Sequence, residues 1–238
     1  MEDRLDALRR RFRSLGVANF IVVRLEQFKQ SNIRYLCGFS GSNGLLLVTR
    51  RDAYFITDNR YITQARQEVS GAQVFAYSTG ESIPEAFVSE LKKNRQIRFR
   101  GRIGIEASGI TAQFCRTLKV AFPKSELVET TGEVERIAAV KTTGEVELIR
   151  KAVEITDRAF AEVLGKVKPG ITERELAAEI TYAHLKHGAE GDAFESIVAS
   201  GPRSALPHGV ASRREVRRGD LLTFDIGCFF AGYASDMT

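Results

Sequence analysis

Two aspartates near the end of the printed sequence have a spacing that could bind metal ions. Asp225 lies inside the apolar run LLTFDIGCFF, and Asp236 follows in AGYASDMT. A buried carboxylate is costly unless a cation or a hydrogen-bond donor compensates its charge. If the chain turns at Ala231-Gly232, Asp236 pairs with Gly227, which shares a strand face with Asp225. We therefore predict that both carboxylates lie on one face of a β-hairpin, with Cα atoms roughly 7–8 Å apart.

A pair of carboxylates in this relation has the chemistry of a two-metal site. Their side chains could hold two divalent cations about 3.5–4 Å apart, which is the separation that two-metal hydrolases use. Gly227 has no side chain and would leave space for the ions. Each residue alone has a plainer explanation: Asp225 could pair with an arginine, Asp236 could be a surface carboxylate, and Gly227 could mark a bulge. A turn of odd length would place the carboxylates on opposite faces.

The composition narrows the class of protein. Apolar residues make up 43% and charged residues 27% of the 238 residues, which is typical of a globular protein with a sizeable core. The three cysteines form no CxxC pair, so the sequence does not indicate a zinc ribbon or a disulfide framework. No segment approaches the roughly 20 apolar residues that span a bilayer, and no apolar core follows the charged N-terminus. We therefore expect no membrane association and a cytoplasmic location.

The net charge of +5 comes with basic residues in three clusters, within 9–13, 92–102 and 213–218. Such clusters could bind the phosphates of a nucleic acid. Acidic residues are interspersed through most of the chain, however, and no pattern of stacking aromatic residues accompanies the clusters. We interpret the clusters as a solvated surface and expect no nucleic-acid partner.

Strand and helix patterns alternate through residues 17–128, which predicts an α/β domain with a mixed or parallel sheet. Gly16 is expected to end the first helix, and Asp58 or Asn59 to cap the second. The expected helices are 2–15, 59–65, 82–93 and 111–120, and the expected strands are 18–23, 44–49, 53–56, 72–77, 102–105 and 127–128.

We place a domain boundary in the polar segment 129–144, which gives domains 1–132 and 133–238. The second domain should open with a helix over 144–167. Thr172 and Glu175 form a capping box for the next helix, which Gly188 ends. On that helix, His184 and His187 are expected to be surface or packing residues. A strand over 196–199, the loop GPRSALPHG and a hairpin of 221–230 with 233–238 should follow. The helix over 144–167 has a predicted buried stripe of Val146, Ile149, Val153, Phe160, Val163 and Val167.

Several segments resemble a known family. The motif DIGCFFAGYASDMT resembles the metal-binding hairpin of the "pita-bread" metallopeptidases, and FESIVASGPRSALPHGVASRREVRRGDLLTFD is similar to the region before it in the Xaa-Pro aminopeptidases and prolidases. The segments NIRYLCGFSGSNGLLLV and TDNRYITQA resemble the creatinase-type N-terminal domain, and VKTTGEVELIRKAVEITDRAF resembles the helix that follows it. The resemblance implies a fold class: an α/β creatinase-like N-terminal domain followed by an incomplete α+β pita-bread catalytic domain.

The resemblance also implies roles for individual residues. Asp225 matches a ligand of one metal ion, and Asp236 matches a carboxylate that bridges both ions. His208 matches a catalytic, substrate-binding histidine that steadies the scissile carbonyl; alone, it could be a loop histidine without a partner. The family's remaining ligands, a histidine and two glutamates, lie C-terminal to this hairpin. We therefore expect the chain to stop before its metal site is complete and to be inactive alone.

The implied activity is hydrolysis of the bond between an N-terminal residue and proline, as in an Xaa-Pro aminopeptidase or dipeptidase. A water bridging two divalent ions would attack the carbonyl; Mn²⁺ is expected, with Co²⁺ or Zn²⁺ as alternatives. The expected partners are peptides with proline at the second position and a second copy of the chain in a homodimer. Two alternatives stay open: a non-catalytic interaction module or pseudoenzyme, and a metal-free creatinase-like amidinohydrolase, against which the two aspartates argue.

Overall fold

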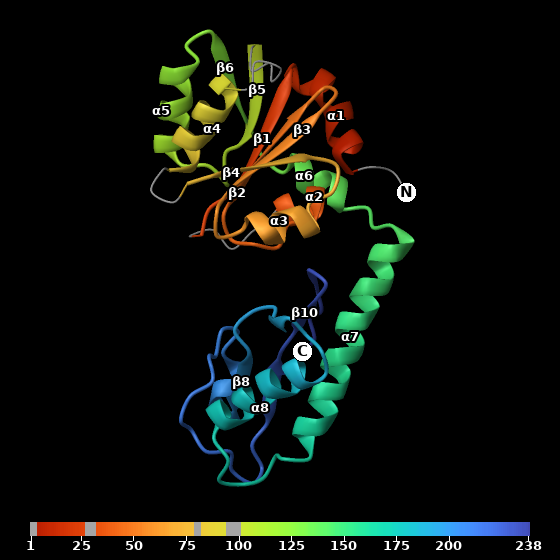
Figure 1. Ribbon diagram of the computed structural model, residues 1–238. Coiled ribbons are helices and arrows are strands. Elements are labelled where there is room, and N and C mark those ends of the chain that lie inside the picture. Colours follow the sequence, from red (N-terminus) through yellow and green to blue (C-terminus); the bar gives the residue numbers. More distant parts are fainter. Residues whose placement is uncertain (1–3, 27–31, 79–81, 94–100) are drawn as a thin grey trace. The chain divides into compact units, whose positions relative to one another are not determined.

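The computed structural model describes residues 4–26, 32–78, 82–93 and 101–238. The chain forms two compact units, Met1–Val140 and Lys141–Thr238. The boundary expected at 132/133 precedes α6 (Glu133–Ala138), the last helix of the first unit. Val134 of α6 is buried in the core of that unit. The units therefore divide after α6 rather than before it (Figure 1).

A mixed six-stranded sheet organises the first unit. Its strands are β1 (Asn19–Arg24), β2 (Gly44–Thr49), β3 (Ala53–Asp58), β4 (Gln73–Tyr77), β5 (Gly101–Glu106) and β6 (Ser125–Thr130). They lie in the order β4-β3-β2-β1-β5-β6. β2 is antiparallel to β1 and β3, and the other neighbours are parallel. The mixed sheet predicted from the alternating pattern is confirmed.

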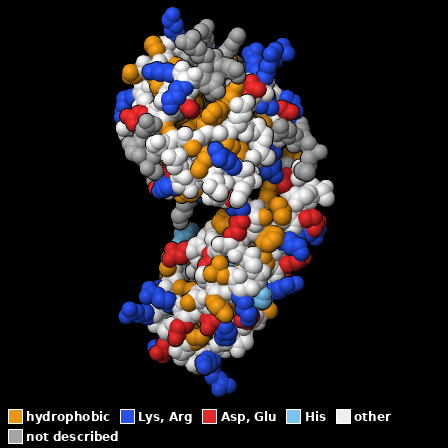
Figure 2. Space-filling model, in the orientation of Figure 1, with side chains coloured by type: hydrophobic (Ala, Val, Ile, Leu, Met, Phe, Trp, Pro, Cys, Tyr) orange, Lys and Arg blue, Asp and Glu red, His pale blue; other side chains and the backbone are white. Residues whose placement is uncertain are grey.

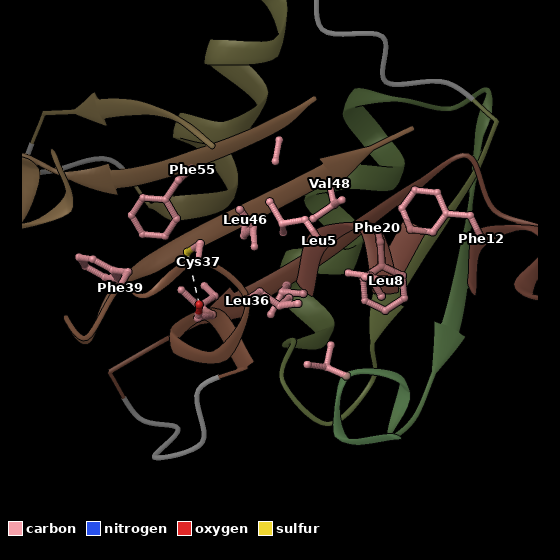
Figure 3. Packing of buried hydrophobic residues seen from close by; sticks show 14 of the residues in the cluster. Leu5, Leu8, Phe12, Phe20, Leu36, Cys37, Phe39, Leu46, Val48 and Phe55 are labelled. Atoms are coloured by element: carbon pink, nitrogen blue, oxygen red, sulfur yellow. Dashed lines mark hydrogen bonds between the residues drawn. The ribbon is translucent and has the colours of Figure 1, made fainter. Parts of the chain in front are cut away.

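Helices cover both faces of this sheet, because alternate residues of each strand point to opposite sides. Phe20 of β1 packs with α1 (Arg4–Leu15), α2 (Asn32–Cys37), α3 (Ile62–Glu68) and α6. Ile21 packs on the other side with α4 (Ile83–Lys93) and α5 (Ala112–Ala121). Figure 3 shows Leu5 and Leu8 of α1 packed against the first face. The continuous apolar run of each central strand is thus explained by burial on both faces.

In this unit one part of the prediction is untested, one helix was not predicted, and one predicted cap is wrong. Residues 2 and 3 of the first predicted helix and the basic segment 94–100 lie outside the described residues. The short helix α2 was not predicted. α3 begins at Ile62 after Tyr61, without a side-chain cap, so the predicted cap is wrong. Asp58 instead accepts hydrogen bonds from the backbone and guanidinium of Arg60 and from Asn43. The end of α1 at Gly16, with φ 64°, is as predicted.

The second unit begins with two helices, α7 (Thr143–Leu164) and α8 (Glu173–Lys186). Each has a complete capping box, Thr142 with Glu145 and Thr172 with Glu175. The second box is confirmed, and the first was not predicted. The inner face of α8, formed by Leu176, Ile180 and Ala183, is fully buried.

The predicted buried stripe of α7 is wrong in part. Val146 and Val153 are 37% and 42% exposed. Val163 is buried as predicted, but the other buried side chains of this helix are Glu145, Ala152, Ile155, Thr156 and Ala159. Small residues dominate this face, and it packs against α8 and the hairpin strands. A stripe chosen by the size of its apolar residues misses such a face, because close packing favours small side chains.

The strands of the second unit are short. They are β7 (Gly191–Asp192), β8 (Ile197–Ser200), β9 (Leu222–Asp225), β10 (Cys228–Phe230) and β11 (Tyr233–Ala234), with a 3₁₀ turn, η1 (Gly201–Ala205), after β8. β8 pairs with β9, and β10 pairs with β7 and β11. The strand predicted over 221–230 is therefore divided, because its two halves pair with different neighbours.

The surface carries mixed charge. On the face drawn in Figure 2, Lys and Arg side chains lie in separate groups with Asp and Glu between them. Cys37 and Cys228 are buried, and Cys115 is half-buried; all three are free thiols. Within the described ranges, no helix is both long and apolar enough to cross a membrane.

Candidate metal centre

The C-terminal hairpin turns where the sequence predicted. Ala231 and Gly232 have φ angles of 48° and 83°, as a two-residue type I′ turn requires. Phe230 pairs with Tyr233 across this turn. The bridge between Ile226 and Met237, closed by two backbone hydrogen bonds of 3.0 and 2.9 Å, lies in the same register. The predicted register is therefore confirmed along the whole hairpin.

This register places Asp225 and Asp236 on one face. Ile226 and Cys228 are fully buried, so the odd-numbered positions of this strand face outward. On the facing strand Ser235 is buried and Asp236 is exposed. Thr238 Oγ1 donates a 3.2 Å hydrogen bond to Asp225 Oδ1, so Thr238 lies on the same face as Asp225. Asp236 is two residues before Thr238 on the same strand and therefore shares that face. Both carboxylates lie on the outer face of the hairpin.

The carboxylates of this outer face are available to a cation. Within the described ranges, neither Asp225 nor Asp236 forms an ion pair, which argues against an arginine as the partner of Asp225. The same part of the chain holds no group of three or more His, Cys, Asp or Glu side chains that could hold a metal ion. Divalent ions take at least four ligands, and hard ions such as Mg²⁺ take six. The two aspartates thus fit a part of such a donor set, and their role as ligands stays a prediction.

A buried hydroxyl pair supports the hairpin from beneath. Ser235, next to Asp236, has its Oγ 2.6 Å from Thr156 Oγ1 of α7. Cys228 N–H donates to the same Ser235 Oγ at 2.9 Å. Tyr233 adds a second link, because its hydroxyl donates to Glu145 Oε1 at 2.9 Å. These bonds fix β11, and with it the position of Asp236, on α7.

The structure explains why position 227 is a glycine, for a reason that the sequence did not indicate. A Cβ at this position would lie 2.1 Å from the carbonyl oxygen of Ser235. Cβ atoms do not approach backbone oxygens so closely, so the two strands could not meet here with any other residue. The glycine is thus explained by the strand contact, and the interpretation that it leaves space for ions is not needed.

His208 lies in the loop between η1 and β9, and its side chain is exposed. Val210, two residues later, forms a bridge with Ile197, and Ile197 pairs on its other side with Asp225. Twice the strand spacing puts the backbone of Val210 roughly 10 Å from that of Asp225. The fold thus brings the histidine loop to the strand that carries the first aspartate. The role of His208 itself stays a prediction.

The other two histidines have structural partners. His184 is fully buried, with Nδ1 2.7 Å from Asp192 Oδ1, and Thr181 Oγ1 donates to the other oxygen of Asp192 at 2.5 Å. His187 Nε2 lies 3.2 Å from Glu162. His184 is therefore a packing residue that joins α8 to β7, one of the two roles that the sequence allowed.

The sequence did not single out Glu173, the first residue of α8. Its carboxylate is fully buried and accepts hydrogen bonds from both ends of the loop that carries His208. Its position beside Thr172 predicts only a residue in the first turn of a helix. No local pattern links it to serines so far along the chain.

Comparison with known families assigns both units. The creatinase/prolidase N-terminal domain family matches residues 4–140, which is the first unit with its six-stranded sheet. Metallopeptidase family M24 matches residues 147–238, which include the hairpin of Asp225 and Asp236. The chain therefore combines a creatinase/prolidase N-terminal domain with a domain of metallopeptidase family M24. The predicted family and fold class are confirmed.

Several peptidases resemble the chain along nearly its whole length. It is 34% identical to the uncharacterized peptidase YqhT of Bacillus subtilis (strain 168), over 99% of this chain and 64% of that protein. The structure matches an Xaa-Pro dipeptidase from Bacillus anthracis with a TM-score of 0.85 and 32% identity, over 98% of this chain and 62% of that one. It matches an X-Pro aminopeptidase from Thermotoga maritima MSB8 with a TM-score of 0.83 and 35% identity, over 95% and 63%. The chain thus spans less than two thirds of the length of each.

Proposed function

We propose that this chain supplies the first metal-binding carboxylates and a substrate-orienting histidine of a metal-dependent Xaa-Pro peptidase. The observation that carries the proposal is the shared outer face of Asp225 and Asp236, in a hairpin that lies within the M24 match. Solved relatives that match both units are named Xaa-Pro dipeptidase and X-Pro aminopeptidase. The proposed substrates are therefore peptides with proline at the second position, and both kinds of specificity are retained.

Each proposed site residue has its own role in the reaction. Two bound divalent ions would activate water and polarise the peptide carbonyl. Asp225 and Asp236 contribute two negative charges on one face, which attract and hold the ions. The buried bonds of Ser235 to Thr156 and Cys228 keep the second carboxylate in place. His208 donates a hydrogen bond from an imidazole N–H to the carbonyl oxygen of the bond that is cleaved.

The proposal extends to the metal, the assembly and the location. Oxygen ligands of this kind suit Mn²⁺, with Co²⁺ and Zn²⁺ as the alternatives. We further propose that the protein acts as a homodimer in the cytoplasm. The chain spans less than two thirds of the length of its relatives. We therefore propose that it is inactive alone and needs further metal ligands, such as the histidine and two glutamates that follow this hairpin in the family.

A chimera tests the proposed function. The C-terminal part of the Thermotoga maritima X-Pro aminopeptidase would follow Thr238, and hydrolysis of Xaa-Pro peptides would be measured with Mn²⁺ beside the 238-residue chain. We expect activity from the chimera alone and a loss of at least about a hundredfold in Asp225→Asn and in Asp236→Asn, because each removes a ligand charge. The exposed Asp157→Asn on α7 is the matched control and should keep full activity.

The same experiment separates the competing functions. Activity that survives the loss of both aspartates would refute the assignment. A folded chimera that binds Mn²⁺ but cleaves no Xaa-Pro peptide would favour a non-catalytic interaction module. Hydrolysis of an amidino substrate without metal would favour a creatinase-like reaction.

A further inference from the structure

Glu173 has a buried carboxylate at the start of α8, and all of its hydrogen bonds go to another segment. Oε1 accepts from the N–H and the hydroxyl of Ser200, at 2.8 and 2.7 Å. Oε2 accepts from the N–H and the hydroxyl of Ser212, at 3.0 and 2.6 Å, and from Arg203 Nε at 3.0 Å. The carboxylate thus receives five hydrogen bonds, three of them on one oxygen.

The donors lie at the two ends of the loop that contains His208. Ser200 ends β8, and Ser212 follows the histidine loop. Arg203 stands between them and also donates from Nη2 to the carbonyl oxygen of Val210 at 2.6 Å. One side chain therefore closes the segment 200–212 into a ring, and His208 lies inside that ring.

The charge of Glu173 is stable in this position. Burial would raise the pKa of Glu173, but the hydrogen bonds from Ser212 and Ser200 outweigh it and lower the pKa to about 2. The guanidinium of Arg203 and the helix N-terminus also favour a negative charge at this place. Glu173 is therefore ionised across the pH range of ordinary enzymes.

Capping of α8 does not explain this residue. Thr172 and Glu175 already form the complete capping box of the helix. The backbone N–H groups of Glu173 and Arg174 donate to the carbonyl oxygens of Arg214 and Ser212, at 3.0 Å each. The side chain of Glu173 is not needed for any of these bonds. A buried charge that serves only the loop points to a role in the position of that loop.

We propose that Glu173 is a positioning residue that fixes the loop 200–212 and so sets where the His208 imidazole stands. The order of the loop is independent of the proposed function, whereas the benefit to peptide hydrolysis rests on the role proposed there for His208. Glu173→Gln keeps the size of the side chain. It turns one acceptor into an NH₂ donor, which then faces either the donors of Ser212 and Arg203 or those of Ser200.

The three histidines of the chain make the test specific. Imidazole ¹H–¹⁵N spectra of the 238-residue chain should show three ring systems, and His208→Gln identifies that of His208. In Glu173→Gln we expect the His208 ring signals to shift and broaden, while those of His187 stay in place. We also expect the amide hydrogen of either Ser200 or Ser212, whichever serine faces the new NH₂ group, to exchange at least about tenfold faster, because it loses its acceptor.

Two further variants keep the test decisive. Glu175→Gln changes the same helix end without touching the loop and should leave the His208 signals unchanged. If Glu173→Gln does not fold, Ser212→Ala removes one of the five bonds and should move the His208 signals in the same direction by a smaller amount. Unchanged His208 signals and unchanged amide exchange in folded Glu173→Gln would overturn the proposal, as would equal effects of Glu175→Gln. None of these readouts needs metal or activity, so a failure of the proposed function is seen separately in the chimera.

Discussion

Glu173 should make the free energy of unfolding of the second unit fall at low pH, and Glu173→Gln should remove this pH dependence. Its pKa is about 2 in the folded protein and about 4.5 in an unfolded chain. A lowered folded pKa stabilises the protein above the unfolded pKa, and this contribution disappears as the pH falls from about 4.5 through about 2. At about 1.4 kcal/mol per pKa unit, the full contribution is about 3 kcal/mol. The side chain is fully buried, so solvent does not screen this interaction.

The assay is urea unfolding of wild type, Glu173→Gln and Glu195→Gln at about pH 5.5 and about pH 3. Proteolysis of the opened chain, with mass spectrometry of the fragments, assigns each transition to a unit. Wild type should exceed Glu173→Gln at the higher pH, and this difference should shrink by about 2 kcal/mol at the lower pH. The exposed Glu195 is the matched control, and its variant should follow wild type within about 0.5 kcal/mol. A difference that does not change with pH would refute the ionised, hydrogen-bonded state of Glu173.

Three further predictions concern packing and charge. Gly227→Ala should destabilise the second unit by more than about 2 kcal/mol in urea unfolding, because its Cβ would meet a backbone oxygen. The control Gly144→Ala places its Cβ in open space on α7 and should stabilise the unit by about 0.5–1 kcal/mol. Equal effects of the two substitutions would contradict the close strand contact. Ser235→Ala should cost about 1–3 kcal/mol, because it leaves a buried N–H without its acceptor, and thermal unfolding that matches wild type would exclude this role. Burial raises the pKa of Glu106 to about 7, so its contribution to stability is present below about pH 4.5 and is lost as the pH rises through 7. Glu106→Gln should therefore unfold at a higher temperature than wild type at pH 8 but not at pH 4. The reverse order of unfolding temperatures would contradict the raised pKa.

The site was predictable from sequence where one local rule decides the geometry. Ala231-Gly232 is a two-residue turn, and a period of two then fixes which side chains share a face with Asp225. Thr172, followed by Glu175, likewise gave the start of α8. In both cases the signal lies within a few residues, so no tertiary contact is needed.

The remaining features depend on contacts between distant residues. Glu173 meets serines at 200 and 212, and nothing in its own neighbourhood distinguishes it from other first-turn glutamates. The buried side of α7 is set by small residues such as Ala152 and Ala159, which a size-based stripe does not select. The cause of Gly227 is the approach of another strand. These features needed the folded structure.

The position of the metal centre is tested most directly by Mn²⁺ in the NMR spectrum of the 238-residue chain. Bound Mn²⁺ broadens nearby amide signals even when it binds weakly. We predict selective broadening of residues 225–227 and 235–238 at substoichiometric Mn²⁺, and its loss in Asp225→Asn and in Asp236→Asn but not in Asp157→Asn. Broadening centred elsewhere, or unchanged at the hairpin when both aspartates are replaced, would contradict the account.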